Sequence, residues 1–160
     1  MIRRIAAGAF VLSALAVVVP PADAADSWTV CSIAGSVAPT PGVAYAPQEG
    51  KYDLKGTMDC TSDNPSHGEV TGTGTGTVGC LGGSSTATLT VAWEGGKTST
   101  MKVQIGDFTY GTGGHGTVED GEFKGSHVML GWGRQAAGAE MRCATGGVKS
   151  YQFAGGLGIG

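Results

Sequence analysis

The chain has 160 residues, 30 of them glycine, and a formal net charge of −3. This length suits one domain that can bury a core of its own. A mild negative charge argues against a nucleic-acid partner, which needs a basic surface, and the lack of a Gly-X-Y period excludes collagen.

The start of the chain has the three-part order of a secretory signal peptide. Residues 1–4 are basic, residues 5–19 form an uncharged apolar run, and residues 22–24 (Ala-Asp-Ala) match the small-x-small pattern that a signal peptidase cuts. The apolar run is too short to span a bilayer comfortably, and no later stretch is long and apolar enough for a membrane segment. We therefore predict a signal peptide over residues 1–24 and a secreted, extracellular domain over residues 25–160.

Apolar and polar side chains alternate along most of the remaining chain, as they do in strands with one buried and one solvent-exposed face. Tyr52, Leu54 and Met58, for example, share one face of their segment. No stretch of ten residues combines helical spacing with helix caps. The alternation and the glycine-rich breaks predict about nine short strands, at residues 28–33, 52–60, 70–79, 86–93, 100–105, 118–123, 127–132, 139–143 and 148–153. We expect an all-β fold, either a single antiparallel β-sandwich or a small β-barrel.

Two segments differ from this pattern. Residues 34–50 contain three prolines and are expected to form a surface loop, with a short edge strand near residues 43–45. Residues 72–77 alternate glycine with threonine. As a strand, this tract turns its glycines inward, where they make room for a bulky side chain such as Trp93 or Trp132.

The four cysteines indicate two disulfides, because an even number in an exported chain is typical of disulfide bonding. None of them lies in a Cys-x-x-Cys pair of the kind that binds zinc. Three pairings exist, and we favour Cys31–Cys60 with Cys80–Cys143. If the strand that ends at Cys60 folds back through a turn at residues 63–66, Cys80 lies near the far end of the return strand, beyond the reach of Cys60.

Cofactor and metal motifs are weak. Residues 74–79 and 111–116 match Gly-x-Gly-x-x-Gly, but neither match precedes a helix, which the dinucleotide motif requires. Metal binding would need histidines to converge with carboxylates. We instead expect all three in turns or at a sheet surface: His67, His115 and His127. The sequence therefore predicts no cofactor and no metal.

Catalytic motifs are equally sparse. No serine lies in a Gly-x-Ser-x-Gly elbow. Glu119 and Glu122 flank a turn and are the nearest approach to the carboxylate pair of a small hydrolase. Because acidic residues beside a turn are usually just solvated, we predict no catalytic residue.

Exposed aromatic residues are better candidates for recognition. Tyr45 lies in the proline-rich loop, Tyr110 precedes a glycine-rich segment, and Trp132 is followed by Gly133 and Arg134. Tryptophan and tyrosine anchor binding surfaces, although Trp132 also continues an apolar face and fits a core position. Residues 131–138 are expected to form a loop that could present Arg134 to a serine protease.

Several features together resemble uncharacterised small secreted β proteins of high-GC Gram-positive, actinobacterial-type bacteria. They are the signal peptide, the four cysteines, and the segments at residues 72–80, 93–99 and 116–125. Residues 91–93 (Val-Ala-Trp) also look like a strand of the biotin-binding barrels. The first resemblance implies no activity and no site residues.

We therefore expect a monomeric, secreted domain that binds an extracellular protein, glycan or small ligand and is not an enzyme. The first alternative is a serine-protease inhibitor that uses residues 131–138. The second alternative is a small hydrolase.

Overall fold

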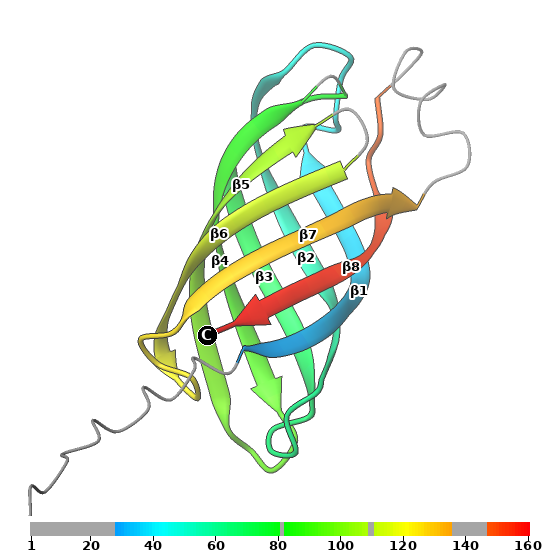
Figure 1. Ribbon diagram of the computed structural model, residues 1–160. Helices are drawn as coiled ribbons and strands as arrows, with labels where there is room; N and C mark the ends of the chain where they lie inside the picture. The colour runs from blue at the N-terminus through cyan, green and yellow to red at the C-terminus, as the bar shows by residue number, and fades with distance from the viewer. Residues whose placement is uncertain (1–27, 81, 109–110, 136–146) are drawn as a thin grey trace, which may run out of the picture.

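The computed structural model describes residues 28–80, 82–108, 111–135 and 147–160. Each strand pairs antiparallel with the next, and the last pairs with the first, so the sheet closes into a barrel (Figure 1). The strands are β1 (Thr29–Thr40), β2 (Gln48–Cys60), β3 (His67–Val78), β4 (Gly83–Trp93), β5 (Thr98–Phe108), β6 (Gly111–Gly121), β7 (His127–Gln135) and β8 (Tyr151–Ile159). The all-β antiparallel prediction is confirmed, and of its two architectures the barrel is the one observed.

The barrel has two distinct ends (Figure 1). The loops after β1 and β3 lie at what we call the upper end. The turns after β2, β4 and β6 lie at the lower end, together with the C-terminus. None of the described residues forms a helix that could cross a membrane.

The strand count and most strand boundaries differ from the sequence prediction. Eight strands are described, and the ninth predicted one, at residues 139–143, lies outside the described residues. The expected loop at residues 34–50 was wrong at both ends, because β1 continues to Thr40 and β2 begins at Gln48. Pro39 is tolerated there because β1 pairs with β8 only as far as Val37, so the proline lies where the strand has a single neighbour. The edge strand expected near residues 43–45 is reduced to one isolated bridge, between Val43 and Val148.

The strand predicted at residues 118–123 begins seven residues earlier in the structure, because β6 starts at Gly111. Its inward glycines lie directly against the backbone of β5. A Cβ atom at Gly116 would overlap the carbonyl oxygen of Lys102, and one at Gly114 would meet that of Gln104 at 2.5 Å. Only glycine permits this close approach between neighbouring strands.

Inward side chains from all eight strands fill the barrel with one continuous hydrophobic core. The predicted apolar faces are confirmed, since Tyr52, Leu54 and Met58 are all buried. The largest fully buried side chains are Phe153, Ile33, Leu54, Met58, Leu89, Met101, Leu157 and Ile159. Burying each such side chain stabilises the fold by about 1.5–3 kcal/mol, so this core dominates the stability of the barrel.

Inward glycines make room for the bulkiest of these side chains. The prediction for the glycine–threonine tract was right that an inward glycine makes room for a bulky side chain and wrong about which one, because the ring of Tyr52 lies over Gly74. Trp93 instead lies against Gly68, at the start of the same strand, and the Cα and Cβ atoms of Trp132 lie against Gly155 of β8.

The disulfide Cys31–Cys60 is present and joins directly opposed residues of β1 and β2. This confirms the first half of the predicted pairing. Cys80 is also disulfide-bonded. Its predicted partner, Cys143, lies outside the described residues, so that half remains a prediction.

Two adjacent glycines of β8 provide a direct test of inward and outward packing. A Cβ atom at Gly155 would overlap the carbonyl oxygen of Gly131, whereas one at Gly156 would meet nothing closer than 3.7 Å. We expect Gly155→Ala to lower the free energy of unfolding by about 1–3 kcal/mol. Gly156→Ala should raise it by about 0.5–1 kcal/mol, because alanine restricts the unfolded chain more than glycine does. Urea denaturation of both variants measures the difference, and equal effects would contradict the described packing.

Candidate functional site

The structure does not bring the predicted interaction residues together on one surface. Tyr45 is exposed in the loop between β1 and β2, and Tyr110 lies outside the described residues. Trp132 is only 6% exposed and packs against Phe153 with ring centroids 5.0 Å apart. It is therefore a core residue.

The loop expected at residues 131–138 was wrong for its described part. Strand β7 continues to Gln135, and Arg134 is paired with Phe153 of β8. The backbone at Arg134 therefore belongs to the closed sheet rather than to a protruding loop.

The outer surface of the barrel divides into a charged and an uncharged part. The outward positions of β2 are mostly charged: Glu49, Lys51, Asp53, Lys55 and Asp59. Among the described residues, the outward positions of β7, β8 and β1 carry no Asp, Glu, Lys or Arg. We call these outward positions the uncharged face: His127, Met129, Gly131, Gly133, Gln152, Ala154, Gly156, Gly158, Val30, Ser32, Ala34, Ser36, Ala38 and Thr40.

A row of four outward glycines crosses the sheet from β5 to β8. The register pairs Gly106 with Gly113, Gly113 with Gly131, and Gly131 with Gly156. Since neighbouring strands lie about 4.8 Å apart, this glycine row is roughly 14 Å long. It forms a strip of bare backbone that a partner could approach closely.

The fold does not require three of the four glycines on the uncharged face. A Cβ atom would meet nothing closer than 3.8 Å at Gly131 and 3.7 Å at Gly156, and nothing within 4 Å at Gly133. None of the three has a left-handed backbone conformation. A glycine inside a strand costs about 0.5–1 kcal/mol relative to alanine, so these positions lower stability without serving the packing.

Large apolar side chains gather on the same face. Of the four that are exposed among the described residues, three are neighbours here: Trp28 (44% exposed), Val30 (55%) and Met129 (60%). Gly158 of β8 is paired with both Val30 and Met129. We call Trp28, Val30 and Met129 the apolar row.

Glycines also support the ring of Trp28. The atoms nearest to a Cβ at Gly160 would be Cδ2, Cε2 and Cγ of Trp28, at 2.7–2.9 Å, and Cε3 lies 3.0 Å from the corresponding position at Gly158. The five-membered ring therefore lies with one face on Gly160. Because the side chain is 44% exposed, part of the indole is available to a partner.

Shallow depressions extend from this region over β4, β5 and β6. The larger has a volume of about 610 Å³ and is bounded by Gly106, Gly113 and Met129. It shares Thr86, Gln104 and His115 with a second depression of about 490 Å³. The hydroxyl, amide and imidazole groups of these residues can donate and accept hydrogen bonds, so polar groups lie beside the bare strip.

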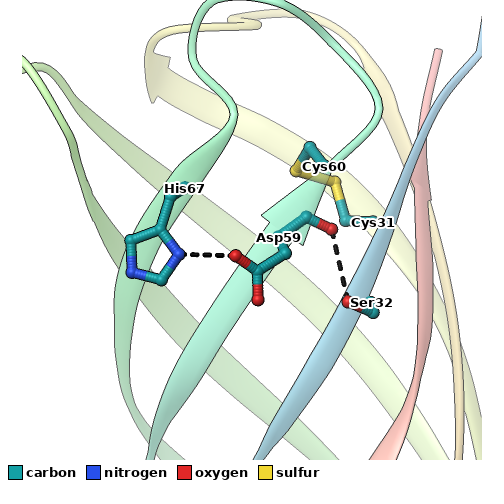
Figure 2. A network of polar contacts seen from close by, with 5 residues as sticks. All are labelled: Cys31, Ser32, Asp59, Cys60 and His67. Atoms are coloured by element: carbon teal, nitrogen blue, oxygen red, sulfur yellow. Dashed lines mark hydrogen bonds and ion pairs between the residues drawn. A yellow bond between two sulfur atoms is a disulfide. The ribbon is translucent and has the colours of Figure 1, made fainter.

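A polar network ends the glycine row on its other side (Figure 2). The register continues from Gly156 to Ser32, from Ser32 to Asp59, and from Asp59 to His67. His67 Nδ1 lies 2.6 Å from Asp59 Oδ1, and the Ser32 hydroxyl donates to the Asp59 carbonyl oxygen at 3.4 Å. The hydrogen bond to Asp59 raises the pKa of His67 above its usual value of 6.5, and the negative charge of Asp59 adds to this effect.

The residues considered for metal binding and catalysis do not form a site. No group of three or more His, Cys, Asp or Glu side chains that could hold a metal occurs in the part of the chain that is described. Glu122 pairs with Lys97 at 3.2 Å, while His115 lies on the outside of β6.

No family model, curated protein or solved structure matches this chain.

The pair of His67 and Asp59 makes stability depend on pH. The pKa of His67 is higher in the folded protein than in the unfolded chain. The pair therefore stabilises the fold fully below about pH 6.5, and this contribution is lost as the pH rises through the folded-state pKa. We expect a small effect, because both side chains are exposed.

NMR titration of the His67 ring measures this pKa directly. Asp59→Asn should return it toward 6.5, whereas Ser32→Ala, which retains the carboxylate, should leave it raised. An unchanged pKa in Asp59→Asn would contradict the assignment of its cause.

Proposed function

We propose that this protein is a secreted, disulfide-stabilised barrel that binds an extracellular partner through its uncharged face and is not an enzyme. The observation that carries the proposal is the coincidence of three features on that face. Charged side chains are missing, glycines occur where packing does not demand them, and the apolar row is exposed.

Each feature lowers the cost of association or adds to its gain. An uncharged surface avoids the desolvation of charged groups, which is expensive unless they are paired again. Exposed backbone allows close approach without ordering side chains, whose immobilisation costs about 0.5–1.5 kcal/mol each. Tryptophan is among the residues most enriched at energetically dominant contacts.

Among the expected partner classes, a neutral glycan fits this face best. A sugar ring presents C–H groups that stack on an exposed indole, as Trp28 offers. Its hydroxyls can pair with Gln104, His115 and Thr86 in the adjoining depressions. An uncharged sugar polymer forms no ion pairs with a protein. The described residues of the uncharged face accordingly include no Asp, Glu, Lys or Arg.

The alternatives receive less support from the described residues. Protease inhibition through Arg134 needs a protruding loop, whereas the backbone there belongs to β7. A hydrolase needs two free carboxylates facing a cleft, whereas Glu122 is paired with Lys97.

Cosedimentation of the mature protein with cellulose, chitin and curdlan, three uncharged polysaccharides, tests the proposal. We expect binding to at least one of these polymers. Trp28→Ala should weaken it at least about tenfold, as expected for an anchoring tryptophan. Gly156→Arg should abolish it, because a long charged side chain would cover the strip, and Gly156→Ala should retain it.

The matched control is Thr71→Arg, on the outside of β3. This residue lines neither depression, and its strand lies three positions from β8 around the barrel, so the same charge is added away from the proposed site. Equal loss of binding in Gly156→Arg and Thr71→Arg would show that net charge, not the uncharged face, decides. A wild-type protein that binds none of the three polymers would refute the glycan assignment.

A further inference from the structure

A small space lies inside the barrel at its upper end, separate from the uncharged face. All eight strands contribute lining residues, among them Tyr52, Ser85, Thr112 and Trp132. A single lining residue, Val43, comes from the loop between β1 and β2. The centre of a water-sized sphere can move within only about 10 Å³ of this space, so the pocket is nearly filled. Because Val43 is the lining residue that lies outside the strands, we describe it as the closure of the pocket.

The two tryptophans of the core differ in their hydrogen bonding. At the lower end, Trp93 donates its indole N–H to the Ser99 hydroxyl at 2.8 Å, and Ser99 donates onward to the Glu122 carbonyl oxygen at 2.7 Å. At the upper end, Trp132 is equally well buried, but its indole N–H meets no acceptor among the described residues. A buried donor without an acceptor costs about 1–3 kcal/mol. The hydrogen bond from Trp93 to Ser99 avoids this cost at the lower end.

The other polar groups of the pocket are uncharged. The Tyr52 and Ser85 hydroxyls are hydrogen-bonded to each other at 2.9 Å, and Thr112 is buried. Among the described residues, the pocket lining contains no Asp, Glu, Lys, Arg or His. An occupant with a full charge would therefore lose its hydration without compensation.

The loop that carries Val43 is held by few contacts. Val43 and Val148 exchange two backbone hydrogen bonds, at 2.8 and 2.9 Å. Their side chains form a small hydrophobic cluster of their own, with Cys80 and Tyr151 partly buried against it. Cys80 N–H donates to the Ala44 carbonyl oxygen at 3.0 Å. Tyr151 packs against both this cluster and the main core. Because the bridge between Val43 and Val148 lies outside the eight strands, lifting the loop breaks none of the strand pairings of the barrel.

We propose that this pocket binds a small neutral molecule with an apolar body and a carbonyl oxygen, which accepts the Trp132 N–H and replaces Val43 as the closure of the pocket. The described wall residues are apolar except for their hydroxyls and this indole donor, and that combination selects such a molecule. The proposal is independent of glycan binding at the uncharged face.

NMR of the indole N–H groups, with cyclopentanone as the probe, tests the pocket. The chain has three tryptophans, and Trp132→Phe identifies the signal of interest by its loss. We expect cyclopentanone to shift the Trp132 signal saturably and to leave the Trp93 signal in place. Val43→Ala should bind the probe several-fold more tightly than the wild type, because less of the closing side chain must be displaced.

Methylenecyclopentane is the matched control, since it has nearly the same shape but no oxygen acceptor. It should bind several-fold more weakly than the ketone, as expected for one lost hydrogen bond. If Val43→Ala does not fold, Val148→Ala serves instead, because it removes the side chain against which Val43 packs. Equal affinity for the two probes, parallel shifts of Trp93 and Trp132, or no saturable shift in the wild type and the folded variant would overturn the proposal.

Discussion

Nine residue pairs join β8 to β1, from Ile159 opposite Thr29 to Tyr151 opposite Val37. They remove the two free edges that an eight-stranded meander would otherwise expose to other chains. Closure also fixes the inner volume, so every inward side chain must fit against those of the other strands. Glycine at positions 74 and 155 is a consequence of this limit. The ring of Tyr52 occupies the place of a side chain at Gly74, and the carbonyl oxygen of Gly131 with the Cα and Cβ atoms of Trp132 occupies it at Gly155.

Local patterns predicted the strands wherever apolar and polar residues alternate. They also predicted the Cys31–Cys60 bridge, because the β2–β3 hairpin carries Cys80 away from Cys60. The first half of β6 was missed because its inward positions include Gly114 and Gly116, and glycine gives no apolar signal. The requirement for Gly116 comes from the backbone of β5, a contact that periodicity within one segment does not contain.

The uncharged face could not be predicted for a different reason. The glycine row that crosses it takes one residue from each of four strands, and only the register aligns Gly106 and Gly113, which lie beside the face, with Gly131 and Gly156, which lie on it. In the sequence these glycines are scattered among many others. Trp28 likewise gave no surface signal, because its supports, Gly158 and Gly160, lie at the far end of the chain. The predicted candidates were single exposed aromatics, whereas the structure makes a surface from residues that are distant in sequence.

In this glycine-rich barrel, each glycine can be sorted by whether folding requires it. Gly95 and Gly96 have left-handed backbone conformations in a turn, and inward glycines such as Gly155 lie against backbone or rings, so folding accounts for all three. Folding does not account for Gly131, Gly133 or Gly156, where alanine would fit and would restrict the unfolded chain more. Natural proteins are selected for sufficient stability, not for the highest stability. Residues that lower stability without a packing reason tend to lie at functional sites. That these unforced glycines share a face with Trp28, Val30 and Met129 is therefore the physical reason to look for the partner there.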